Sequence, residues 1–135
     1  MYSRNSLSEP FYISLEVVLE IHQRQLREFG GANGIRNRAG LEAAVEVPRS
    51  MFDGQDLYST LFLKAAAYAF HIAEAQVFID GNKRAALDVA LTFLAINGHE
   101  ITAERLELYE AMIAIAEKRM SKEDLASLFA RLVSD

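Results

Sequence analysis

Residues 76–87 read QVFIDGNKRAAL and place a carboxylate, a glycine, an asparagine and two adjacent cations between apolar runs. From Asn82 to Ile96 the apolar residues follow the three-and-four spacing of a helix, which Asn82 can cap. Lys83 and Arg84 then lie in the first turn, at the positive end of the helix dipole, where each costs about 0.3–1 kcal/mol unless an anion is near. The stretch therefore predicts a phosphate site at a helix N-terminus.

The other residues of this stretch have uses at such a site. Asp80 lies close enough in sequence to hold Mg²⁺ against a bound phosphate, and Gly81 allows the backbone to turn sharply and approach a ligand. Phe78 is expected to anchor the loop on the core. A plainer interpretation stays open, in which the Asp-Gly-Asn run is an ordinary turn with a helix cap, the Phe is core, and the two cations are solvated or pair with acids.

Hydrophobic periodicity predicts helices on both sides of this loop. The expected helices span residues 14–29, 41–47, 57–75, 82–96 and 103–117, with a last one opened by Ser121. Ser14 and Gly30 are expected to cap and stop the first helix, and residues 48–56 to form a loop. The alanine-rich helix 57–75 is apolar on nearly all sides and is expected in the middle of the fold, with residues 99–102 as a short extended piece. The sequence predicts an all-α compact single domain over residues 1–135, a bundle of about six helices.

Composition limits the classes of partner. A chain of 135 residues fits one domain, and its net charge of −5 argues against DNA or RNA as a partner. There is no cysteine, and the three histidines are too scattered to suggest a zinc motif. No run approaches the length of a membrane span, and the first residues have no basic region followed by an apolar stretch. A cytoplasmic protein without membrane contact is expected.

The stretch QVFIDGNKR resembles the signature loop of the Fic/Doc family, His-x-Phe-x-Asp-Gly-Asn followed by Gly-Arg or Lys-Arg. Its Lys83-Arg84 form resembles the Doc (death-on-curing) branch. FGGANGIRNRAGLEAAVEVPRSMF at residues 29–52 and LTFLAINGHEI at residues 91–101 resemble the Doc segments on either side of the loop. The resemblance covers roughly residues 11–102 and implies the compact helical fold of that family.

The resemblance also implies a reaction. Family members move part of a nucleoside triphosphate onto a protein hydroxyl; Fic enzymes typically transfer AMP, and Doc toxins transfer phosphate to elongation factor Tu and so stop translation. The AMP-transferring branch usually has Gly at the position of Lys83 and Arg at that of Leu87, so phosphate transfer is the expected reaction here. ATP and Mg²⁺ are the implied cofactors, with Asp80 as the metal residue and a phosphate site made by Gly81, Asn82, Lys83 and Arg84.

Gln76 departs from the family pattern, which has at that position a histidine that takes the proton from the attacking hydroxyl. Such a base contributes typically about 10²–10⁴-fold, and glutamine has no usable pKa. We therefore expect a Doc-type toxin whose transfer is impaired; the alternative is a catalytically silent helical domain that binds a nucleotide or a partner. Gln76 is either native to a degenerate relative or introduced to silence a toxic protein, and the sequence leaves both open. Asn37 and Val77 stand where the Doc-like pattern often has Asp and Pro.

The remaining expectations concern partners and the histidines. The resemblance implies a separate antitoxin whose disordered tail folds into an apolar groove of the helical domain. The family's built-in inhibitory helix, with Ser or Thr four residues before Glu, has no match, since Glu9 is preceded at that distance by Asn5. His71 is interpreted as a hydrogen-bonded core histidine, and His22 and His99 are assigned no role.

Overall fold

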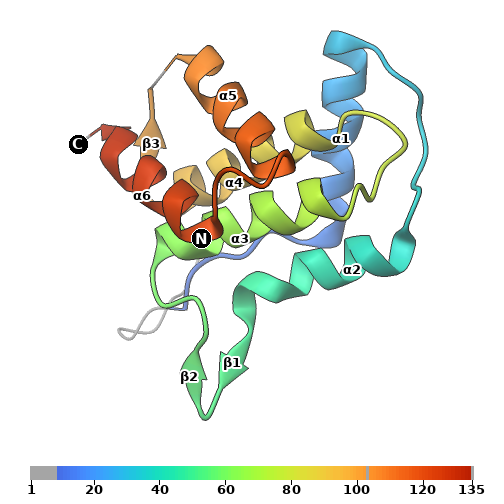
Figure 1. The fold of residues 1–135 in the computed structure, drawn as a ribbon. Helices are drawn as coiled ribbons and strands as arrows, with labels where there is room; N and C mark the ends of the chain where they lie inside the picture. The colour runs from blue at the N-terminus through green and yellow to red at the C-terminus, as the bar shows by residue number, and fades with distance from the viewer. Residues whose placement is uncertain (1–8, 103, 135) are drawn as a thin grey trace.

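The computed structural model describes residues 9–102 and 104–134, where it contains six α-helices (Figure 1). The prediction of an all-α bundle of about six helices is confirmed. The predicted single domain over residues 1–135 also includes residues that lie outside the described part. The helices are α1 (Leu15–Phe29), α2 (Arg38–Glu46), α3 (Leu61–Glu74), α4 (Asn82–Ile96), α5 (Arg105–Ala116) and α6 (Lys122–Leu132).

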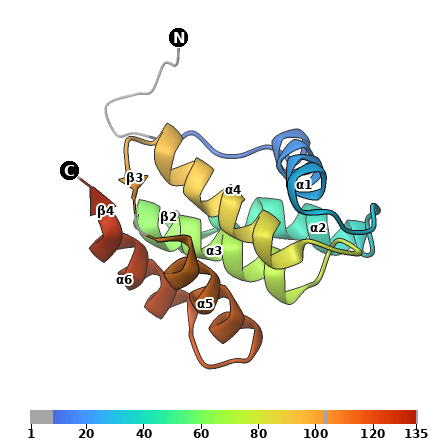
Figure 2. The same ribbon diagram turned by 90° about the horizontal axis from the view of Figure 1, so that it is seen from above.

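Helix α3 lies in the middle of the bundle and contacts α2, α4, α5 and α6, and α4 lies across it in Figure 2. Ala65, Ala66, Ala67 and Ala69 are fully buried, so neighbouring helices reach the α3 backbone from several sides. The expected central position is confirmed, but the expected start at residue 57 is wrong. The Thr60 hydroxyl accepts a hydrogen bond from the backbone N–H at position 63 and begins the helix there.

The boundaries of α1 confirm the sequence prediction, because Ser14 caps it and Gly30 ends it. Helix α2 begins three residues earlier than the predicted position 41, because the Asn37 side chain accepts a hydrogen bond from the Gly40 N–H and acts as its cap. The chain then makes a single 3₁₀ turn over Val47–Arg49, which includes Pro48.

The segment expected to be a loop at residues 48–56 contains a short antiparallel hairpin. Strands β1 (Met51–Phe52) and β2 (Gln55–Asp56) pair across a turn in which Asp53 has a φ of 55° and Gly54 a φ of 78°. Asp-Gly is the dipeptide that such two-residue turns prefer, so the signal was present in the sequence. The buried Lys64 ammonium holds the base of the hairpin through an ion pair of 3.1 Å with the Asp56 carboxylate.

The C-terminal part of the chain closes against α4. Strand β3 (Glu100–Ile101) confirms the expected extended piece and pairs antiparallel with β4 (Val133–Ser134). Helix α5 begins at position 105, and Ala103, where the predicted helix starts, lies outside the described residues. Helix α6 begins after Ser121, as the sequence predicted, and Ser121 and Asp124 form a reciprocal capping box there.

Two side chains, the buried Tyr68 of α3 and the half-buried Asn97 at the end of α4, tie the segment before α1 to these two helices. The Tyr68 hydroxyl accepts a hydrogen bond from the Ile13 N–H at 2.9 Å and donates one to the Ile13 carbonyl at 3.3 Å. Burial raises the pKa of Tyr68 to about 12, so the hydroxyl stays neutral. The Asn97 amide makes the equivalent pair of bonds with the Phe11 backbone at the end of α4.

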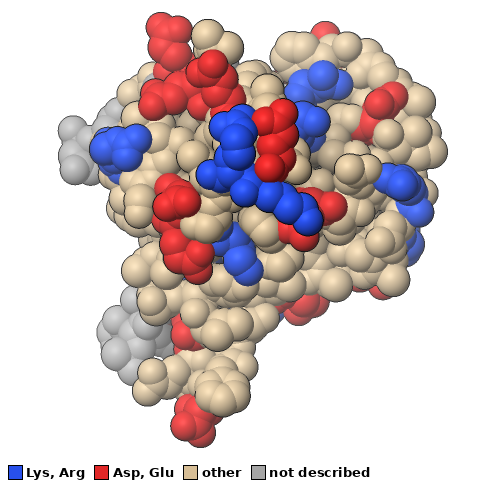
Figure 3. Space-filling view, in the orientation of Figure 1, with Lys and Arg blue, Asp and Glu red and all other residues tan. Residues whose placement is uncertain are grey.

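The surface carries both signs of charge. Figure 3 shows a group of Lys and Arg side chains near the centre of one face with acidic side chains directly beside it. This mixed face agrees with a chain that carries 14 Lys and Arg and 19 Asp and Glu. Within the described residues, no helix is both long and apolar enough to span a bilayer.

The bond between Tyr68 and Ile13 leads to a stability prediction. Tyr68→Phe should lower the free energy of unfolding by about 1–3 kcal/mol, because it leaves a buried N–H and carbonyl without their partner. Urea denaturation followed by circular dichroism measures the change. Tyr109→Phe is the matched control, since the Tyr109 hydroxyl has no hydrogen-bond partner among the described residues, and a loss as large as that of Tyr68→Phe would contradict the assignment.

Candidate functional site

The loop between α3 and α4 is held by backbone pairing with the segment before α2. Ile35 and Phe78 form an antiparallel bridge. Hydrogen bonds on both sides extend it, from the N–H groups of Arg36 and Asn37 to the Val77 carbonyl at 2.7 and 3.1 Å and from the Ile79 N–H to the Gly34 carbonyl at 3.0 Å. This pairing fixes the path of the loop, because each bond joins residues about forty positions apart.

Phe78 lies fully buried beneath the loop. Its ring stacks on the imidazole of His22 from α1, with ring centroids 3.6 Å apart and planes 5° from parallel. Asn82 holds the backbone on either side of it, since its Oδ1 accepts a hydrogen bond from the Phe78 N–H at 2.8 Å and its Nδ2 donates one to the Phe78 carbonyl at 2.9 Å. Phe78 and Asn82 therefore join the loop to the core and to the first turn of α4.

The expectation that Asn82 caps α4 is wrong. The residue at the cap position is Gly81, with a φ of 79°, and no side chain caps the helix. The first backbone bond of the helix runs from the Ala85 N–H to the Gly81 carbonyl, so the N–H groups of the three residues before Ala85 have no acceptor within the helix. A ligand with acceptor oxygens can take these three donors.

His22 has a role in the loop that the sequence did not indicate. Its Nε2 lies 2.8 Å from the backbone carbonyl of Asp80, and Nε2 must carry the proton, because a carbonyl oxygen only accepts. Burial lowers the pKa of His22, the hydrogen bond to Asp80 opposes this, and the charge of Arg84 lowers it further. No sequence signal marks His22, because its partner is a backbone group 58 positions away.

The Asp80 side chain is oriented by the turn after α1. One carboxylate oxygen, Oδ2, accepts a hydrogen bond from the Ala32 N–H at 2.8 Å, and within the described residues Oδ1 has no such partner. Gly31 makes this approach possible, because a Cβ there would lie 3.2 Å from the Asp80 Cβ and its φ of 123° disfavours other residues. Asp80 thus presents an oriented carboxylate beside the N-terminus of α4.

Lys83 and Arg84 are not neutralised by the protein. In the part of the chain that the structure describes, neither forms an ion pair with a carboxylate, which excludes the interpretation that they pair there with acids. Arg84 donates a hydrogen bond of 3.3 Å to the Gly30 carbonyl and lies 5.3 Å from the centroid of the Phe29 ring. Its buried Nε has no partner among the described residues, so the guanidinium keeps an unused donor.

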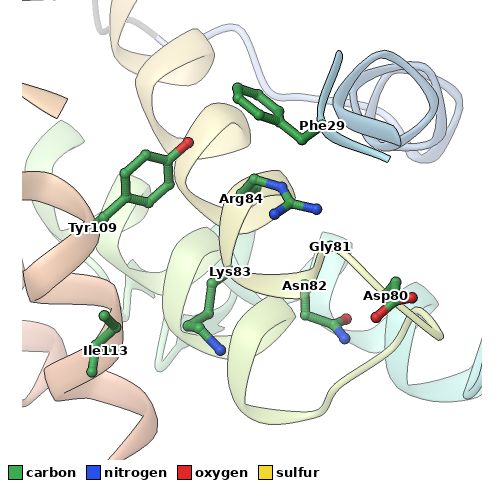
Figure 4. A pocket seen from close by; sticks show the side chains of 8 residues that line it. All are labelled: Phe29, Asp80, Gly81, Asn82, Lys83, Arg84, Tyr109 and Ile113. Carbon is green, nitrogen blue, oxygen red and sulfur yellow. The ribbon is translucent and has the colours of Figure 1, made fainter. Parts of the chain in front are cut away.

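These residues line a cavity of about 520 Å³ between α1, the start of α4 and α5 (Figure 4). Figure 4 shows Phe29 and Tyr109 on different sides of the cavity, with the Arg84 guanidinium next to Phe29. The sequence did not predict the apolar wall of this cavity, because its members come from α1 and α5, which are distant in sequence. The lining residues are Phe29, Asp80, Gly81, Asn82, Lys83, Arg84, Tyr109 and Ile113.

Gln76 does not line this cavity. It is exposed, has a φ of 47°, and faces a second cavity of about 760 Å³ between the end of α3 and the turn from α5 to α6. Its Oε1 accepts a hydrogen bond of 2.6 Å from the guanidinium of Arg36. A left-handed backbone at a residue other than glycine is uncommon and concentrates at functional positions. The loop therefore separates two cavities, with Gln76 on one side and Asp80 to Arg84 on the other.

The described residues contain no group of three or more His, Cys, Asp or Glu that could hold a metal ion without a ligand's help. A site for Mg²⁺ on Asp80 would thus need phosphate oxygens and water to complete it, which is how this ion is often bound.

His71 confirms its interpretation as a hydrogen-bonded histidine, although it is half-buried rather than fully buried. Its Nε2 lies 3.0 Å from the Lys122 ammonium and must accept there, because the ammonium only donates. Burial lowers the pKa of His71, and the charge of Lys122 lowers it further. His71 therefore bonds to Lys122 of α6, and we assign it no part in the site.

Comparison with known proteins gives a family match. A family model described as the Fic/DOC family matches residues 12–94, more than half of the chain. The chain is 42% identical over 76 residues to the protein named Toxin Doc of Mycolicibacterium smegmatis, covering 56% of this chain and 58% of that relative. It is 28% identical over 121 residues to the protein named Protein kinase doc of Escherichia phage P1, covering 90% of this chain and 94% of that relative. The matched range of the family model includes the loop but not Tyr109 or Ile113.

The lowered pKa of His22 predicts how stability depends on pH. An unfolded histidine titrates near 6.5, so between that pH and the lower pKa of the folded state the unfolded chain binds more protons. Acidification from about pH 7.5 to about pH 5.5 should therefore lower the free energy of unfolding, by up to about 1.4 kcal/mol per pH unit from this group. His22→Gln removes the titration while keeping an amide donor, and we expect a weaker pH dependence than in the unmodified protein.

Urea titrations at several pH values measure this difference. His99→Gln is the control, because His99 packs against Phe62, away from the loop. Equal pH dependence of the unmodified protein and His22→Gln would show that His22 does not couple protonation to folding.

Proposed function

Because the chain belongs to the Fic/Doc family, on its Doc branch, we propose that it is a Doc-type toxin of a toxin–antitoxin module. In this proposal it binds a nucleoside triphosphate, ATP in the first place, and transfers phosphate to a hydroxyl of a translation protein that resembles elongation factor Tu. The observation that carries the proposal is the pair Lys83 and Arg84, which lies at an uncapped helix N-terminus without a carboxylate partner among the described residues.

Phosphate oxygens would occupy the end of the cavity formed by the first turn of α4. There the N–H groups of residues 82–84 supply donors that the helix does not use. Lys83 supplies a point charge, and Arg84 supplies a guanidinium whose Nε is unused. An anion at this place would offset the cost of about 0.3–1 kcal/mol for each cation in the first turn.

Asp80 would hold Mg²⁺ at the same place. The bond from the Ala32 N–H to Oδ2 orients the carboxylate and leaves Oδ1 to face a ligand. Bound Mg²⁺ supplies positive charge against the phosphate oxygens and is commonly held by one or two carboxylates plus those oxygens. Asp80 fits this requirement as the carboxylate of the cavity.

The apolar end of the cavity suits the base of the nucleotide. Phe29, Tyr109 and Ile113 line it opposite the phosphate end, and aromatic faces stack well on flat nucleobases. Phe29 is 58% exposed, so its ring is accessible to a ligand in the cavity. A nucleobase over this ring would also lie near Arg84, whose guanidinium already contacts Phe29.

The acceptor hydroxyl would approach Gln76 from the second cavity. Phosphoryl transfer depends largely on positioning and charge, so an active site without the family base retains part of its rate. Gln76 has no usable pKa and cannot take the hydroxyl proton. We therefore propose that transfer is slow. The second candidate is a catalytically silent domain that binds a nucleotide or a partner, and Gln76 favours this candidate as well.

Two named relatives support the coarser parts of this proposal. The name Toxin Doc supports a toxin, and with it a separate antitoxin as partner. The name Protein kinase doc supports transfer of phosphate rather than AMP. By analogy, the antitoxin would supply a peptide segment that folds onto this domain.

The phosphate site can be tested by calorimetric titration with ATP and Mg²⁺. Arg84→Ala should weaken binding by about tenfold to a hundredfold, because charge-assisted hydrogen bonds contribute about 1.5–3 kcal/mol. Arg38→Ala is the matched control, since Arg38 is exposed on α2 and pairs with Glu42. Unchanged affinity in Arg84→Ala, or no binding by the unmodified protein, would exclude the phosphate site.

The impairment can be tested by transfer of labelled γ-phosphate to a purified translation factor. Gln76→His should raise the rate, because it restores a group that can accept the hydroxyl proton. The binding of ATP should change little, since residue 76 does not line the nucleotide cavity. Binding without any gain in transfer would favour the silent binding domain.

A further inference from the structure

The side chain of Gln76 is held by Arg36. An Nη1 nitrogen of the guanidinium lies 2.6 Å from Oε1 of the Gln76 amide. A guanidinium has donors and no acceptor, so only the oxygen of the amide can face it. The Nε2 group of Gln76, which can only donate, is therefore the group left for a substrate.

The backbone places these two side chains opposite each other. The Arg36 N–H donates to the Val77 carbonyl at 2.7 Å, next to the bridge between Ile35 and Phe78. Gln76 has the left-handed φ of 47°, and its N–H bonds back to the Ala73 carbonyl at 3.2 Å. Both backbones are thus fixed by bonds that do not involve either side chain, so the contact follows from the loop geometry.

The charge of Arg36 is not otherwise used by the described residues. No carboxylate there lies within ion-pair distance of its guanidinium, and its side-chain hydrogen bond goes to a neutral amide. A cation in contact with residue 76 opposes any positive charge that would form at that position. This matters for a general base, since a neutral base becomes positive when it takes a proton.

We propose that Arg36 is a positioning residue that keeps position 76 a hydrogen-bond donor. Gln76 then orients the acceptor hydroxyl by donating from Nε2 to its oxygen, and takes no proton from it. As the bond from the γ-phosphate to ADP breaks and ADP leaves, the hydroxyl proton passes to an oxygen of the transferred phosphate or to water. The effect of Arg36 on the rate rests on the proposed transfer reaction. The contact between Arg36 and residue 76 can be tested without that reaction.

The proposal has a consequence for a histidine introduced at this position. A neutral imidazole has a single unprotonated nitrogen. If Arg36 donates to that nitrogen, the other nitrogen carries the proton and cannot act as the base. The charge of Arg36 also lowers the pKa of the imidazole. Gln76→His alone therefore recovers part of the rate, and removal of the guanidinium recovers more.

The experiment compares four proteins: Gln76→His, the double variant Gln76→His with Arg36→Met, a control double variant Gln76→His with Arg38→Met, and the unmodified chain. Methionine keeps the length of the apolar stem of arginine, and Arg38 is an exposed arginine two residues away that pairs with Glu42. Nitrogen-15 NMR measures the tautomer and pKa of the introduced imidazole. Transfer of labelled phosphate and calorimetric affinity for ATP with Mg²⁺ are measured on the same samples.

We expect the imidazole of Gln76→His to titrate below its usual value of about 6.5 and to favour one tautomer. Arg36→Met should raise that pKa and shift the tautomer. It should also increase transfer by about tenfold or more, which is a part of what a general base contributes. Arg38→Met should change neither the pKa, the tautomer nor the transfer rate. The same pKa and tautomer with and without Arg36 would overturn the inference, even if ATP binds. Failure of ATP binding in all four proteins would instead refute the proposed function, and the NMR comparison would still decide the role of Arg36.

Discussion

The site depends on how the loop between α3 and α4 is fastened to α1. His22 donates a hydrogen bond to the Asp80 carbonyl and stacks flat on Phe78, so one neutral imidazole holds both the backbone and the anchor of the loop. Burial lowers the pKa of His22, and a neutral ring suits this position, because a second cation would stand close to Arg84. The polar side chains of the loop can therefore be rigid although they lie at the surface, since their supports lie beneath them.

The loop also divides two environments. On one side, Asp80, Lys83 and Arg84 face a cavity with an aromatic wall; on the other, Gln76 faces a cavity bounded by the end of α3 and the turn between α5 and α6. In the proposed transfer reaction, the two cavities would recognise donor and acceptor separately, and the reacting atoms would have to meet at the loop, about 3–3.5 Å apart. The second cavity is lined by both basic and acidic side chains, including Lys118 and Asp124.

Sequence reasoning succeeded where chemistry follows local pattern. Helix α4 begins and ends where periodicity predicted, and the anion site that the cations of its first turn indicate stays a prediction. It failed where partners are distant or are backbone groups. Asn82 was expected to cap the helix, but it bonds to the backbone of Phe78. Phe29 and Tyr109 line one cavity only because α1 and α5 flank α4. The bonds from His22 to the Asp80 carbonyl and from Arg36 to Gln76 join segments that no single-sequence pattern brings together.

The uncapped start of α4 has a practical consequence for anyone who handles the protein. Among the described residues, three backbone donors there have no acceptor within the helix and two cations have no carboxylate partner. A small oxyanion that bound there would therefore stabilise the folded domain. Phosphate and sulfate in a buffer are such anions. If the site binds phosphate as proposed, a melting temperature recorded in phosphate buffer is that of the phosphate-bound domain. An amine buffer with chloride as the anion gives a value closer to that of the anion-free domain.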